Sequence, residues 1–170
     1  MKNQGSSIKE SKEQMSILSL FSVKNLQNTD EILRKVNEGI DINTADSGGR
    51  TLLMEATIWK NHKLMKLLLE RGANVNEVDE RNWSALHFAA QNYDPLAAKI
   101  LIEAGADLNS SDNYGNTIIS TAVLNSAGRG EVITLLINYG ADADIKNKSG
   151  ISALDLAKTI SNYNVLQYFE

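Results

Sequence analysis

The sequence predicts an all-α solenoid of stacked repeats, and two periodic patterns support that prediction. Glycine recurs at Gly39, Gly72, Gly105 and Gly140, and each of these glycines has Asn or Asp four positions later. The intervals between them are 33, 33 and 35 residues. A fixed period of this size is typical of stacked supersecondary units and not of one closed core.

A second pattern runs in step with the glycines. A turn residue is followed by a hydroxyl residue, then by aliphatic residues and an alanine. Gly or Asn suits a turn with positive φ, the hydroxyl suits a helix N-cap, and alanine lets two helices approach closely. Each copy therefore predicts a turn that enters a helix. The four copies are Gly49–Ala56, Asn82–Ala89, Gly115–Ala122 and Gly150–Ala157.

These patterns together resemble the ankyrin repeat, over roughly residues 14–170. The segment Ser84-Ala85-Leu86-His87-Phe88-Ala89 is similar to that family's T-P-L-H-x-A signature. The resemblance implies helix-turn-helix units with β-turn tips. The chain departs from the family at the proline position, which is occupied by Leu52, Ala85, Ile118 and Ala153.

The periodic landmarks divide the chain into consecutive units. Residues 1–12 are polar and charged, and we expect a disordered N-terminal tail. A terminal unit needs an apolar face on one side only, because no neighbour stacks beyond it. The expected units are an N-terminal capping repeat at 13–45, ankyrin repeats at 46–78, 79–111 and 112–146, and a C-terminal capping repeat at 147–170.

The first half of the chain is expected to form four helices. Apolar residues at helical spacing predict helices at 14–24 and 30–38 in the first unit. The first full repeat is expected to place helices at 51–59 and 62–71. The second of these is apolar on more than one face, as expected where neighbours pack on both sides.

The second half repeats this arrangement. Helices are expected at 84–92 and 95–104, and Pro95 falls in a first helical turn, where its missing N–H costs nothing. Helices at 117–125 and 131–139 follow, and the extra residues of this repeat fall in the glycine-containing loop between them, at 125–130. The last pair is expected at 152–159 and 163–169.

Composition narrows the classes of partner. The net charge is −4, which disfavours nucleic acid and anionic membranes. The chain has no cysteine, no segment of signal-peptide type and no apolar run of transmembrane length, so we expect a cytoplasmic protein. Plentiful Asn and Ile with a single Pro favour an AT-rich, bacterial genome.

Motifs for catalysis or cofactor binding are absent from the sequence, so we expect neither an enzyme nor a cofactor or metal protein. His62 and His87 lie in different repeats without a Cys partner, and we expect His87 to bond to the turn and His62 to be solvated. Recurrent aspartates, among them Asp112, are expected to fix turns through Asx bonds. A phosphate-binding loop at 128–130 is an alternative reading of those glycines.

The resemblance also implies where a partner protein binds: the turn tips and the exposed ends of the inner helices. Large side chains at the matching positions form the expected surface, since Trp, Tyr and Arg dominate interface energetics. Two alternatives stay open, that Trp83 folds onto a neighbouring turn and that Trp59 fills a gap between helices. The candidate binding residues are Arg50, Trp59, Glu80, Arg81, Trp83, Tyr114, Asn116 and Ile151.

Several functions fit these expectations. The resemblance favours a non-enzymatic protein-binding module, monomeric when free, and within that class an immunity protein or inhibitor that occludes a toxin or effector. The alternative is a regulatory adaptor that bridges other proteins. An enzyme or metal protein would show turnover or bound metal, and a structural oligomer would self-associate.

Overall fold

The computed structural model describes residues 29–170; the tail at 1–12 and the helix at 14–24 that the sequence predicts lie outside this range. The described part contains eight α-helices and one short 3-10 helix, and its only β pairings are isolated bridges. The helices are α3 (Thr29–Asn37), α4 (Leu52–Ile58), α5 (His62–Glu70), α6 (Ala85–Gln91), α7 (Pro95–Glu103), α8 (Ile118–Asn125), α9 (Glu131–Asn138), α10 (Ala153–Thr159) and η1 (Val165–Phe169).

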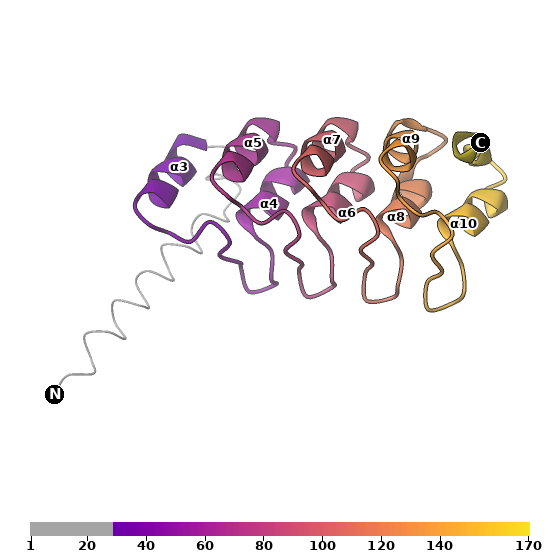
Figure 1. The fold of residues 1–170 in the computed structure, drawn as a ribbon, viewed down its shortest axis with the longest axis horizontal. Coiled ribbons are helices and arrows are strands. Elements are labelled where there is room, and N and C mark those ends of the chain that lie inside the picture. The colour runs from indigo at the N-terminus through magenta and orange to yellow at the C-terminus, as the bar shows by residue number, and fades with distance from the viewer. Residues whose placement is uncertain (1–28) are drawn as a thin grey trace.

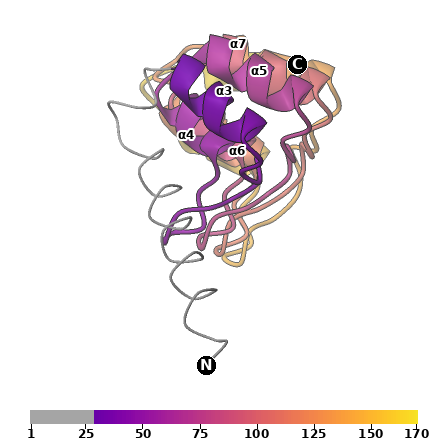
Figure 2. The same ribbon diagram turned by 90° about the vertical axis from the view of Figure 1, so that its left-hand side faces the viewer.

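The helices stack in two rows. The outer row contains α3, α5, α7, α9 and η1, and the inner row contains α4, α6, α8 and α10 (Figure 1). Each inner helix from α4 to α8 packs against its outer partner and against the inner helix of the next repeat. The long loops that connect the outer helix of one repeat to the inner helix of the next project to one side of both rows (Figure 2). This arrangement is the all-α repeat solenoid that the sequence predicts.

A hydroxyl residue starts every inner helix. Thr51, Thr117 and Ser152 accept hydrogen bonds from backbone N–H groups three positions on, at 3.1 to 3.4 Å. At Ser84 the backbone N–H donates to Nδ1 of His87, 3.1 Å away, which completes a capping box with the hydroxyl. These bonds satisfy N–H groups that a helix start leaves without partners.

The core runs continuously through the inner row. The first six residues of α4, α6 and α8 are all buried, because another helix packs on each side of them. The outer helices α5 and α9 bury only part of their surface. The aliphatic and alanine residues at the family's proline position lie inside this core: Leu52, Ala85, Ile118 and Ala153.

Each loop ends in a turn that an Asx side chain closes. Asp79 Oδ1 accepts from the backbone N–H groups of Arg81 and Trp83, both at 2.9 Å. Asp46, Asp112 and Asn147 repeat this arrangement in the other loops, so the Asx role expected of Asp112 is confirmed. An Asx bond of this kind fixes a turn without regular strands.

Backbone hydrogen bonds link consecutive turns. The N–H of Glu80 donates to the carbonyl of Gly48 at 3.2 Å. The N–H of Asn113 donates to the carbonyl of Arg81, and that of Lys148 to the carbonyl of Tyr114, both at 3.0 Å. The spacing between tips is therefore set by the main chain. Side chains at equivalent tip positions start from neighbouring backbones, which makes the tips one continuous row.

A second set of inter-repeat bonds runs through the repeat endings. Asn43 Oδ1 accepts from Asn74 N–H, Asn76 Oδ1 from Asp107 N–H, and Asn109 Oδ1 from Asp142 N–H, all at 2.8 Å. The Asn that lies four positions after Gly39, Gly72 and Gly105 thus joins its repeat to the next one. The periodic pattern that reveals the fold is itself part of what holds neighbouring repeats together.

Two tip glycines differ in their surroundings, which gives a stability prediction. Gly115 and Gly150 have φ of +82° and +76°, but a Cβ at Gly115 would lie 3.0 Å from Lys148 N, whereas one at Gly150 would meet nothing within 4 Å. We expect Gly150→Ala to cost about 1 kcal/mol from backbone strain and Gly115→Ala at least about 1 kcal/mol more from the contact. Urea unfolding measures both, and equal losses would contradict the close approach.

The loop of the third repeat is held by tyrosines from both sides. The insertion lies between α8 and α9, where the sequence predicts it. Tyr93 donates its hydroxyl proton to the carbonyl of Arg129, and Tyr168 donates to the carbonyl of Gly128 at 2.9 Å. A Cβ on Gly130 would lie 2.1 Å from the Tyr168 ring. These contacts give the glycines of this loop a packing role.

Within residues 29–170, the predicted helix bounds agree with the structure to within one residue at each end, with one exception. The helix predicted at 163–169 was wrong in type and start, since a 3-10 helix begins at Val165. Among residues 29–170, no helix is long and apolar enough to cross a bilayer.

Candidate functional site

The eight candidate residues lie at the loop tips and at the end of one inner helix. Arg50, Trp83, Asn116 and Ile151 each directly precede an N-cap residue, and Trp59 directly follows α4. Arg81 and Tyr114 occupy the same tip position in consecutive repeats, next to Glu80. We call this set the tip surface: Arg50, Trp59, Glu80, Arg81, Trp83, Tyr114, Asn116 and Ile151.

Trp83 is half-buried and packs within its own repeat. Its ring is stacked with His87, with centroids 5.8 Å apart, and makes an edge contact with Phe88 at 5.3 Å. It therefore covers the start of α6. Part of the indole remains accessible, so the residue both packs against the core and contributes to the tip surface.

Arg81 lies above this aromatic pair. Its guanidinium carbon is 4.4 Å from the Trp83 ring centroid and 5.4 Å from that of Phe88. Nε and Nη2 both donate to Asp79 Oδ2, at 3.1 and 3.0 Å. Asp79 is the residue that closes the turn, so one buried carboxylate fixes both the loop and the arginine.

Glu55 is an unpredicted part of the site. It is buried on α4, accepts from Trp59 Nε1 at 3.2 Å and pairs with Arg50 Nη1 at 3.0 Å. Burial raises the pKa of Glu55, although the charge of Arg50 and the Trp59 hydrogen bond lower it. Phe88, at the equivalent position of the next repeat, is apolar, and this contrast is the sequence signal that could have identified Glu55.

The other tip residues differ in how freely they meet solvent. Tyr114 is 74% exposed and Ile151 is also exposed, whereas Asn116 bonds through its amide to Asp112 and to Asn147. Trp59 is 48% exposed, so it does not fill a gap between helices. Within the tip surface, the aromatic side chains that offer the most open surface are therefore Tyr114 and Trp59.

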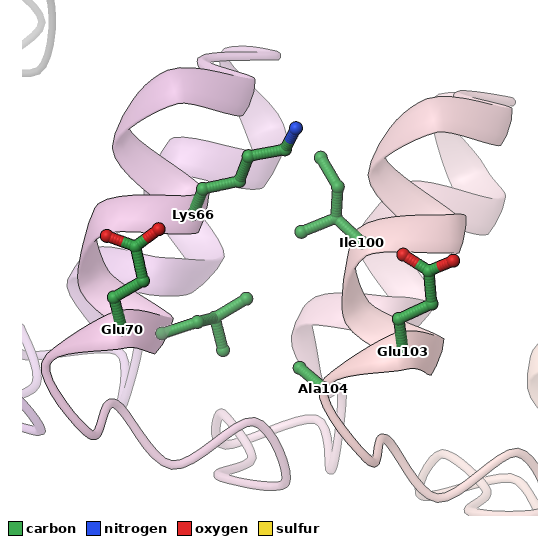
Figure 3. A pocket seen from close by; sticks show the side chains of 6 residues that line it. Lys66, Glu70, Ile100, Glu103 and Ala104 are labelled. Atoms are coloured by element: carbon green, nitrogen blue, oxygen red, sulfur yellow. The ribbon is translucent and has the colours of Figure 1, made fainter.

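Shallow hollows occur on two sides of the molecule. A depression of about 350 Å³ lies between the first two tips and is lined by Gly48, Arg50, Asp79, Glu80 and Arg81. A groove of about 240 Å³ lies between α5 and α7, where Lys66 and Ile100 reach toward each other (Figure 3). The groove is the space between two neighbouring outer helices, whereas the depression belongs to the tip surface.

The two histidines have structural partners. His62 Nε2 lies 2.7 Å from Asp94 Oδ2 of the next repeat, so the expectation that His62 is simply solvated was wrong. His87 is buried in its capping box, as expected, and burial lowers its pKa to about 4. In the described residues 29–170, no three His, Cys, Asp or Glu side chains gather as metal ligands would.

Comparison with known families gives a match over most of the chain. A family model of ankyrin repeats, in three copies, matches residues 20–112 and again residues 72–147. A Fowlpox virus (strain NVSL) protein named for ankyrin repeats is 32% identical over 156 residues, which are 87% of this chain and 46% of that protein. A Rickettsia bellii protein of similar name is 33% identical over 153 residues, covering 81% of this chain and 43% of the relative.

Other relatives broaden the range of organisms. An Escherichia coli (strain K12) protein named for ankyrin repeats is 22% identical over 157 residues, covering 71% of this chain and 78% of its own length. Human ankyrin repeat domain-containing protein 63 is 34% identical over 117 residues, 64% of this chain and 30% of its own. This chain spans less than half the length of the viral and Rickettsia relatives. These names mention neither a toxin nor immunity, and the organisms do not point to one kind of source.

Proposed function

We propose the function of this chain from one premise: it belongs to the ankyrin repeat family, whose repeats are protein–protein interaction modules. The proposed binding site is the tip surface. The observation that carries this proposal is a set of exposed large side chains that the chain itself holds in place. Glu55 fixes Arg50 and Trp59, and Asp79 fixes Arg81, so little conformational entropy is lost when a partner covers them.

The narrower proposal is a stoichiometric, cytoplasmic inhibitor or immunity protein that covers the active site of a toxin or effector. A rigid row of tips suits one tight partner, because preorganisation lowers the cost of binding. A net charge of −4 makes another protein a better partner than nucleic acid or an anionic membrane. We propose that the free chain is monomeric.

One observation favours an adaptor as the alternative. Leu96 and Tyr139 are exposed large side chains on the outer row, away from the inner-helix tips. A second protein bound there would leave the tip surface available, and the chain would bridge two proteins. An inhibitor is instead expected to form a complex with one partner and to abolish that partner's activity.

Affinity purification from the native source, with identification by mass spectrometry, separates the two proposals. The inhibitor proposal predicts one dominant partner in equimolar complex, whose activity returns when the chain is removed. The adaptor proposal predicts a ternary complex from which a Tyr139→Ala variant loses one member. Absence of any protein that the tip surface retains would contradict both.

Replacement of Tyr114 tests the tip surface directly. We expect Tyr114→Ala to weaken partner binding about tenfold or more, because exposed tyrosines are frequent hot spots. Its free energy of unfolding should change by less than about 0.5 kcal/mol, since Tyr114 is 74% exposed. Tyr139→Ala is the matched control on the outer row; equal weakening by both variants would contradict the assignment. Trp83→Ala is less informative, because Trp83 also packs on His87 and Phe88.

A further inference from the structure

The charge of Arg81 is already neutralised within the chain. Its side chain is 55% exposed, but the Asp79 carboxylate that holds two of its N–H groups is only 3% exposed. A partner that approaches Arg81 therefore contacts a guanidinium whose charge is already balanced by the Asp79 carboxylate. The buried carboxylate is not available to the partner.

Arg50, the other arginine of the tip surface, is engaged in the same way. It pairs with Glu55 at 3.0 Å and with Asp46 at 3.6 Å, and both carboxylates are mostly covered. Lys148 differs, because its Nζ donates to the neutral backbone carbonyl of Asn113 at 2.8 Å. The two tip arginines thus show positively charged groups that already have a carboxylate partner.

Arg81 also has a defined flat surface. One face of the guanidinium lies over Trp83, with 4.4 Å between carbon and ring centroid, and the Arg81 backbone carbonyl accepts from the N–H of Asn113, the residue before Tyr114. A planar guanidinium stacks well on aromatic rings. Covering an unpaired cation with an apolar group is costly, and covering one already paired with a carboxylate costs less, because no uncompensated charge is buried.

We infer that the partner protein presents an aromatic side chain that stacks on the open face of Arg81, with Tyr114 as a neighbouring contact. This inference rests on the proposed protein-binding function and names the chemistry of its central contact. The competing occupant is an acidic segment that uses Arg81 as a charge. The two differ in their response to salt and to lysine at position 81, because lysine keeps the charge and lacks the plane.

A random peptide library displayed on phage and selected on the full chain provides the probe. Parallel selections use the wild type, Arg81→Lys and, as a control, Glu103→Gln, which removes an exposed charge on the outer row and leaves the stack intact. We expect the wild type to enrich peptides with Trp, Tyr or Phe at one fixed position. Such peptides should bind Arg81→Lys about tenfold more weakly and Glu103→Gln within about threefold of wild type.

Salt dependence completes the test. The affinity of the enriched peptides should change less than about threefold between about 50 and 500 mM NaCl, since no new ion pair forms. The selection could instead enrich peptides rich in Asp or Glu, which bind Arg81→Lys as tightly as wild type and whose affinity falls steeply with salt. That result would overturn the aromatic inference but not the proposed protein-binding function. If the selection enriched no peptide that binds at Tyr114, the result would count against both the aromatic inference and the proposed protein-binding tip surface. Self-association of the chain that Arg81→Lys disrupts would make a second copy the occupant, and overturn the inference.

Discussion

Leu86→Asp is expected to abolish folding. Leu86 lies on α6 with no exposed surface, between α4 on one side and α8 on the other. A carboxylate there would have no partner, and its burial would cost about 4 kcal/mol or more, a large part of the stability of a domain. Because repeats are stable only through their neighbours, damage in the middle of the array affects both halves. Far-UV circular dichroism and urea titration should show no cooperative transition.

Leu96→Asp provides the matched control for that variant. Leu96 is 50% exposed and lies in the first turn of α7, where a negative charge interacts favourably with the helix dipole. Its free energy of unfolding should differ from that of the wild type by less than about 0.5 kcal/mol. A normally folded Leu86→Asp variant, or an unfolded Leu96→Asp variant, would contradict the stacking register described above.

Acidification should destabilise the fold through His87. Nδ1 accepts a hydrogen bond from Ser84 N–H, so the ring is neutral with its proton on Nε2, and Nε2 has no partner in the described structure. Burial is the main reason that its pKa falls from 6.5 to about 4, although nearby aspartates, Asp112 first among them, oppose the shift. Protonation would place an imidazolium in the core and break the capping bond.

The sign of this pH effect follows from proton binding. Between the two pKa values the unfolded chain holds a proton on this side chain and the native chain does not, so falling pH favours unfolding. The stabilising contribution is complete above pH 6.5 and is lost as the pH falls towards about 4. From pH 7 to pH 5 we expect a loss of about 2 kcal/mol from this group.

His87→Gln isolates the contribution, because a glutamine at this position can still accept from the N-cap backbone and does not titrate. The free energy of unfolding, measured in urea at pH 7 and pH 5, should fall by about 2 kcal/mol less in the variant than in the wild type. An identical pH dependence in both proteins would show that His87 is protonated in the native state or accessible to water.

The local signals in the sequence explain why most helices were predicted well. Thr51, Ser84, Thr117 and Ser152 mark their helix starts by residue type alone, and each acts as an N-cap in the structure. The last helix was mispredicted because Asn164, which precedes Val165, makes no side-chain capping bond, and the segment from Val165 forms a 3-10 helix. N-cap residues are strong local signals of where a helix begins. Whether a short terminal segment forms an α-helix or a 3-10 helix depends instead on packing.

The candidate site was only partly predictable, because the side-chain bonds that organise it join residues at different positions of the repeat. The repeat pattern assigns each position by itself and does not predict such bonds. The repeat placed Arg81, Trp83 and Tyr114 on one row, but it gave no indication that Asp79 would neutralise Arg81. Glu55 was missed because a buried acid on a helix is unusual, and its partners Arg50 and Trp59 lie on the two sides of it. His62 and Asp94 are 32 positions apart, so only the stacked repeats bring them together.

The most direct test of the central claim is site-specific photo-crosslinking in the native cell. A benzophenone-bearing phenylalanine analogue is placed at position 114 on the tip row or at position 139 on the outer row; both native tyrosines are exposed. Binding through the tip surface predicts that position 114 yields one prominent adduct with another protein and that position 139 yields none with that protein. An adduct with that protein from position 139 alone, or no adduct from position 114, would contradict the account.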